Sequence, residues 1–71
     1  MAKIEAKNAL GQTPIFSAAV GPNAVNLVPF LIEHGAAINV RDSNGMTALA
    51  WAITHDRHPA IEILRAYGGI E

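Results

Sequence analysis

The sequence contains no cysteine in its 71 residues. It therefore excludes the disulfide-rich secreted class and zinc fingers built on thiolates. Charge is also scarce: Asp, Glu, Lys and Arg make up 15% of the chain, against about 25% in an average soluble domain. The net charge of −1 gives no electrostatic footprint for DNA or for an acidic membrane surface. We therefore expect neither nucleic acid nor a membrane as a partner.

Long apolar runs are missing as well. The most apolar stretch, Val25 to Ile32, is interrupted by Asn26 and Pro29 and falls short of the roughly 18 residues that span a bilayer. The first seven residues carry charges at short intervals and lack the apolar core of a signal peptide. These features predict a cytoplasmic protein.

Apolar residues are what the chain has in excess, at 51% of the sequence with a mean hydropathy of +0.24. A chain of this length forms one domain at most, which we place over residues 1–71. A chain this apolar has few charged residues to place on its surface. This composition suggests that part of the surface is covered by something else.

An internal repeat organises the chain. The segment GQTPIFSAA, which begins at Gly11, aligns with GMTALAWAI, which begins at Gly45, 34 positions later. Further on, LIEHG ending at Gly35 aligns with LRAYG ending at Gly68, 33 positions later. Turns accept insertions easily, so we assign the one-residue difference to the cluster at 21–23.

Each copy predicts two short helices, over residues 14–20 and 24–33 in the first copy and 48–54 and 59–66 in the second. Thr13 followed by Pro14 is typical of a helix start, with the hydroxyl accepting from free backbone N–H groups. Gly35 is typical of a helix C-cap. Pro29 is harmless if its helix begins near Asn26, and it predicts a kink if the helix begins earlier.

A 33-residue period of a β-turn and two helices, with Thr-Pro-Leu-His-x-Ala at the first helix, is the ankyrin repeat signature. The chain resembles this family from about Asn8 to Gly68, through TPIFSAA and FLIEHGAAIN in the first copy and DSNGMTALAWA and IEILRAYG in the second. The resemblance implies an all-α solenoid of two helix-turn-helix repeats, about 8–40 and 41–71, with a β-turn finger between them.

The departures from the family pattern remove local polar bonds. Phe16 and Ala50 stand where the family has a histidine that ties the Thr hydroxyl to the next loop, Ala48 replaces Pro14, and Ala37 replaces an aspartate. These changes are expected to affect the stiffness of the β-turn fingers and to leave the fold intact.

The number of repeats is unusual, because three or more are normally needed and the terminal copies normally have a polar outer face. Neither copy here has such a face, so we expect exposed apolar surface at one end of the stack or more. Three explanations stay open. The chain is part of a longer array, pairs end to end with another copy, or docks on a partner as a small free-standing protein.

The family binds partners with its finger tips and the exposed edge of the first helix of each repeat, and the resemblance implies a protein partner of unknown identity here. Trp51 either faces this groove, as an aromatic interface residue would, or packs between repeats. The predicted partner-binding residues are Leu10, Gln12, Arg41, Ser43, Asn44, Met46, Trp51, Thr54, His55 and Tyr67.

Chemistry other than binding is weakly supported. His55, Asp56 and His58 could ligate zinc, but a third and fourth ligand are not visible, and a solvated turn explains them as well. No nucleophile elbow, phosphate loop or catalytic cysteine is present. The sequence thus predicts a non-catalytic protein-binding module without metal or cofactor. The alternative is a homo-oligomerising structural or inhibitory unit whose exposed repeat faces pair with another copy.

Overall fold

The computed structural model describes residues 6–71 and contains four helices in that range and no strand. They are α1 (Pro14–Val20), α2 (Ala24–Glu33), α3 (Ala48–Thr54) and α4 (His58–Ala66). The first three match the predicted ranges. The fourth begins one residue earlier than predicted, at His58, which places Pro59 at its second position, where a missing N–H costs little. The predicted all-α helix-turn-helix architecture is confirmed.

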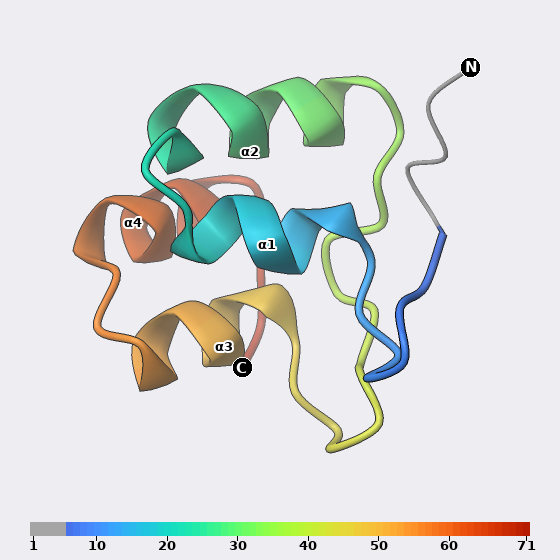
Figure 1. Ribbon diagram of the computed structural model, residues 1–71. Coiled ribbons are helices and arrows are strands. Elements are labelled where there is room, and N and C mark those ends of the chain that lie inside the picture. The colour runs from blue at the N-terminus through green and yellow to red at the C-terminus, as the bar shows by residue number, and fades with distance from the viewer. Residues whose placement is uncertain (1–5) are drawn as a thin grey trace.

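The helices form two layers (Figure 1). The first layer contains α1 and α3, and the second contains α2 and α4. Repeat 1 consists of α1 and α2, and repeat 2 consists of α3 and α4. Between the repeats, α1 packs on α3 and α2 packs on α4. The short turns that join α1 to α2 and α3 to α4 lie at one side of the stack, and the two fingers lie at the other (Figure 1).

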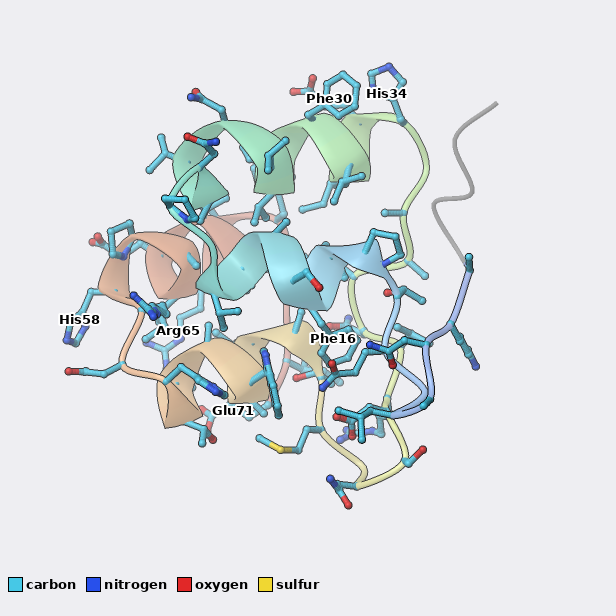
Figure 2. The ribbon with its side chains drawn as sticks, in the orientation of Figure 1. Phe16, Phe30, His34, His58, Arg65 and Glu71 are labelled. Carbon is cyan, nitrogen blue, oxygen red and sulfur yellow. The ribbon has the colours of Figure 1, made fainter. Side chains whose placement is uncertain are left out.

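The core lies between the repeats. Its largest fully buried side chains are apolar except for one threonine, and they are Phe16, Ile15, Leu64, Val28 and Thr47. The Phe16 ring lies between α1 and α3 (Figure 2). Buried alanines, such as Ala19, Ala52 and Ala60, let the helix backbones approach closely.

Helix α2 begins at Ala24, so Pro29 lies inside it, the case for which the sequence predicts a kink. Pro29 has no N–H to donate to the carbonyl of Val25. The helix is nevertheless unbroken from Ala24 to Glu33. Its apolar residues pack against α1 and α4, which holds the chain helical through the proline.

The two helix-start threonines differ. Thr47 accepts from the N–H of Ala50 at 3.2 Å and donates its hydroxyl proton to the carbonyl of Ile70. Thr13 makes no side-chain cap bond, and its buried hydroxyl has no partner among residues 6–71. The prediction that the Thr13 hydroxyl caps α1 is therefore wrong. The polar bonds that the family pattern would supply are indeed lost in repeat 1.

Candidate protein-binding surface

Two short loops project beside the first helix of each repeat; we call residues 8–12 finger 1 and residues 42–46 finger 2. In finger 1, the side-chain oxygen of Asn8 accepts from the N–H groups of Leu10 at 2.9 Å and Gln12 at 3.0 Å. In finger 2, Asp42 Oδ1 accepts from the N–H groups two and four positions later, at 2.9 Å and 3.0 Å. Each finger is therefore closed by its own first side chain.

The fingers are also bonded to each other. The N–H of Ser43 donates to the carbonyl of Leu10 at 3.0 Å, and Gln12 Nε2 donates to Asp42 Oδ2 at 3.1 Å. Gly11 has a φ of 73°, and a Cβ there would lie 2.9 Å from the Ser43 hydroxyl. The same Cβ would lie 3.1 Å from the backbone nitrogen of Ser43, so a larger residue would press on finger 2 and would also be strained by the positive φ. The two fingers thus form one rigid unit.

Asp42 is the charged group at the centre of this unit. The N–H of Met46 is the main cause that lowers the pKa of the Asp42 carboxyl, and the bonds from Gln12 and Asn44 act in the same direction. Burial opposes them and raises the pKa, but the net direction is downward. The carboxylate is therefore ionised at neutral pH, and its bonds hold the fingers closed.

Gln12 is a predicted partner contact, but the structure places it inside the unit formed by the two fingers. Its residue is 6% exposed, and its amide is committed to Asp42. Among residues 6–71 this amide is the only side-chain donor to the carboxylate, so turning it outward would leave a buried charge less well paired. Gln12 supports the fingers instead of facing solvent.

The finger tips are exposed. Leu10, Ser43 and Asn44 are solvent-exposed, and Met46 is half-buried. The polar bonds of Leu10 and Asn44 in finger closure come from backbone atoms, so their side chains are free to contact a partner. Arg41 precedes finger 2 and donates to the carbonyls of Gly45 at 2.9 Å and Glu71 at 3.4 Å. It braces the base of the finger while remaining exposed.

Helix α3 adds an aromatic pair. The rings of Trp51 and His55 lie 4.4 Å apart between centroids, with 46° between their planes. His55 Nδ1 contacts the carbonyl of Trp51 at 2.9 Å, and because a carbonyl only accepts, Nδ1 carries the proton. In the neutral ring, Nε2 is then an exposed acceptor. Thr54, also exposed, donates to the carbonyl of Ala50 at 3.0 Å.

The position of Trp51 can be judged from its equivalent in repeat 1. That equivalent is Ser17, which is exposed although repeat 2 stacks on repeat 1. The exposure of Ser17 shows only that this position does not face the following repeat. Half-buried Trp51 packs partly against the core, and its ring also lies beside His55. Trp51 therefore remains a predicted groove residue that also contributes to packing.

Tyr67 is placed apart from the other predicted residues. It follows α4, which belongs to the second helix layer, whereas the fingers lead into α1 and α3. Eight of the ten predicted residues are exposed or half-buried and lie in or directly beside the fingers and α3; they are Leu10, Arg41, Ser43, Asn44, Met46, Trp51, Thr54 and His55. Gln12 and Tyr67 are the exceptions.

An open hollow of about 370 Å³ lies between the segment at finger 1 and α1. Lys7 and Ser17 line it together with Gln12, Thr13 and Pro14. The sequence-based selection of site residues missed Lys7 and Ser17. The repeat offset was the available signal, because it relates Ser17 to Trp51 and Lys7 to Arg41.

The histidine turn between α3 and α4 has a simple arrangement. His58 Nε2 lies 2.8 Å from Asp56 Oδ1, and both side chains are largely exposed. His55 is turned back onto its own helix through Nδ1. Across residues 6–71 no three His, Cys, Asp or Glu side chains come together as a set that could hold a metal ion. In the same range, none of the helices has the length and apolar character needed to cross a membrane.

Comparison with known proteins agrees with this architecture. A sequence model described as ankyrin repeats (3 copies) matches residues 1–71. Human ankyrin repeat domain-containing protein 63 is 33% identical over 69 residues, covering 93% of this chain and 18% of the relative. A putative ankyrin repeat protein, L92, of Acanthamoeba polyphaga mimivirus is 33% identical over 66 residues, covering 93% and 16% respectively. The chain thus spans less than a fifth of these relatives.

Ankyrin repeats are in general modules for protein–protein interaction and are typically non-catalytic. The family match covers the whole chain and has three copies, where residues 6–71 contain two helix pairs. The stacked helix pairs, the bonded fingers and these similarities lead to one conclusion: the chain belongs to the ankyrin repeat family.

Proposed function

We propose that this chain binds a partner protein, without catalysis and without a cofactor, through the finger tips and the exposed side of α3. The proposed compartment is the cytoplasm. The binding surface would consist of Leu10, Ser43, Asn44 and Met46 from the fingers, Arg41 at their base, and Trp51, Thr54 and His55 from α3. Tyr67 is left out of the surface because it lies in the other helix layer.

The observation that carries this proposal is the closure of the fingers. Their backbones are held by the Asn8 and Asp42 side chains and by the bond from Ser43 to Leu10. A partner would therefore meet side chains whose backbone is already ordered, and little entropy would be lost on binding. Trp51, Met46 and Arg41 are residue types enriched at the centres of protein interfaces.

The experiment uses a photo-crosslinking amino acid at position 44, on finger 2, and the same amino acid at position 25 as a control. Val25 is exposed and lies on α2, away from the fingers. A protein crosslinked through position 44 and not through position 25 would then be purified and titrated against the chain. Trp51 is the single tryptophan, so binding at this surface should change its fluorescence.

Two variants decide the result. Leu10→Asp and Met46→Ala, which both keep the Trp51 signal, should each weaken binding of the purified protein by roughly tenfold or more, the loss expected of an interface anchor, while the helical circular dichroism stays unchanged. Val25→Glu should leave binding intact. Equal crosslinking from both positions would contradict the proposal, and so would binding that neither surface variant weakens.

The second candidate function is association between copies of this chain. It is favoured by the exposed apolar residues on the outer sides of the repeats, among them Leu27, Phe30 and Ile53. These residues are separate from the proposed finger surface. Binding of a partner and association of copies can therefore be tested independently.

A further inference from the structure

The contact between repeat 1 and repeat 2 indicates which kind of surface would pack against each open side of the stack. A position buried in repeat 1 but more exposed in repeat 2 lies on the open side of repeat 2, which we call the C face. Ala19 is fully buried, whereas its equivalent Ile53 is 37% exposed. Val28 is fully buried, whereas its equivalent Ile61 is only half-buried. The C face is therefore the repeat-2 equivalent of the surface of repeat 1 that packs against repeat 2.

The opposite difference marks the open side of repeat 1, which we call the N face. Ala60 is fully buried, whereas its equivalent Leu27 is 42% exposed. Ile63 is half-buried, whereas its equivalent Phe30 is 52% exposed and points away from the other helices (Figure 2). The N face is therefore the repeat-1 equivalent of the surface of repeat 2 that packs against repeat 1, and it carries larger side chains.

The side chains of the two faces also differ in size from those of the internal contact. The C face carries Ala50 where repeat 1 carries Phe16, so it lacks a large ring. The N face carries Leu27 and Phe30 where repeat 2 carries Ala60 and Ile63, so it has gained volume. Both faces nevertheless carry apolar residues at these positions, as the internal contact does.

The finger edges are complementary in their backbone groups. Inside the chain, Ser43 N–H donates to the Leu10 carbonyl at 3.0 Å. The equivalent groups at the two ends are the N–H of Ala9, one repeat before Ser43, and the carbonyl of Asn44, one repeat after Leu10. Neither group makes a hydrogen bond within residues 6–71. Stacking of two copies would bring this donor to this acceptor.

The polar side chains at the finger edges permit such a contact. Within the chain, the carboxylate of Asp42 is matched by the Gln12 amide. At the ends, finger 2 offers Met46 and finger 1 offers Asn8, which is neutral. Pairing these edges would bury no unmatched carboxylate, so it would avoid the largest electrostatic cost. Arg65 and Glu71, which lie 3.6 Å apart, are the equivalents of half-buried Ile32 and Ile38, so this contact would cover them as a pair of opposite charges.

We propose that a second copy of this chain is the occupant of these faces, stacked head to tail so that the C face of one copy covers the N face of the next. The contact would continue the one that already joins repeat 1 to repeat 2. It is heterologous, because each copy contributes a different face, so it leaves one face open at each end and allows further copies to add. Its helix residues, such as Phe30 and Ile53, lie outside the proposed partner surface, whereas the edge of finger 2 would take part in both contacts.

The test measures molar mass by sedimentation equilibrium of the chain across a hundredfold dilution series. The mass should rise with concentration above twice 7.5 kDa, because head-to-tail contacts do not close. Phe30→Glu on the N face and Ile53→Glu on the C face should each give a monomer when alone. Each contact needs one N face and one C face, so an equimolar mixture of the two variants should form a dimer and stop there.

Val25→Glu is the matched control, because Val25 and its equivalent His58 are both exposed and so lie on neither face. It should associate as the unchanged chain does. A chain that remains at 7.5 kDa throughout, a mixture that stays monomeric, or a single-face variant that still dimerises would each overturn the proposal. The last outcome would show that like faces pair. Circular dichroism of every variant separates loss of association from loss of the fold.

Discussion

Repeat 1 and repeat 2 share a sequence pattern but have different surroundings. Thr13 and Thr47 stand one repeat apart at equivalent helix starts, yet only Thr47 has hydrogen-bond partners for its hydroxyl. The difference arises in the segment that follows each repeat. After α4, the chain returns so that Ile70 meets Thr47, and Asn39 holds this return through bonds to Gly68 at 3.3 Å and Ile70 at 2.9 Å. In a repeat protein, the energetic role of a residue thus depends on its neighbouring repeat as much as on its place in the pattern.

The largest difference between equivalent environments should appear at the two phenylalanines. Phe16 is fully buried between the repeats, and Phe30 is half exposed on the N face. Phe16→Ala should lower the free energy of unfolding by about 3–5 kcal/mol, which is most of the stability of so small a domain. Phe30→Ala should cost less than about 1 kcal/mol in dilute solution. Thermal unfolding followed by circular dichroism measures both, and equal losses would contradict the assignment of Phe16 to the repeat contact.

The finger glycines give the next largest contrast. Gly11 and Gly45 have φ angles of 73° and 77°, so alanine at either position should cost about 1 kcal/mol in backbone strain. Gly11→Ala should cost about 1 kcal/mol more, because its Cβ would meet Ser43, whereas nothing lies within 4 Å at Gly45. Urea unfolding of both variants would test this order. Equal costs would mean that the fingers are not held together as described.

The two threonines should respond with opposite signs. Thr47→Val removes a cap and a bond to Ile70, and we expect a loss of about 1–2 kcal/mol in the free energy of unfolding. Thr13→Val removes a buried hydroxyl that has no partner, so it should be neutral or stabilising. Urea titrations at neutral pH measure both changes. Destabilisation by Thr13→Val would show that its hydroxyl is bonded in solution.

The smallest expected contrast concerns Asp42 and Asn8, which close the two fingers in the same way. The folded state lowers the pKa of Asp42, so ionised Asp42 stabilises the fold fully above the ordinary pKa of about 3.9. This contribution is lost as the pH falls through the lower folded value. Asp42→Asn should therefore be less stable than the unchanged chain at pH 7, and the gap should close as the pH falls below the ordinary pKa of about 3.9 and through the lower folded pKa.

Urea midpoints across this pH range provide the measurement for Asp42, and Asn8→Asp is the counterpart in finger 1. No Gln side chain within residues 6–71 is placed to reach position 8 as Gln12 reaches Asp42, so Asn8→Asp should gain less from ionisation. A gap for Asp42→Asn that is constant with pH would show that its charge has no part in closing finger 2.

The helices were largely predictable because their signals are local. Thr-Pro at the start of α1, the glycine after α2 and the alignment of the two copies place three helices within their observed bounds. The exposed tips, such as Leu10 and Asn44, also followed from the pattern. Gln12 did not, because its burial depends on Asp42, which lies 30 residues away in the sequence.

What the sequence alone determined is the repeat, the helices and the family, because helix capping, apolar spacing and glycine turns act between residues a few positions apart. Only the tertiary structure decided which of two equivalent residues is hydrogen-bonded, as for Thr13 and Thr47. It also decided which is buried and which is exposed, as for Ala19 and Ile53. Those outcomes depend on the surface that the adjacent repeat presents. A one-dimensional pattern specifies each repeat, but it is the stack that sets the environment of each side chain.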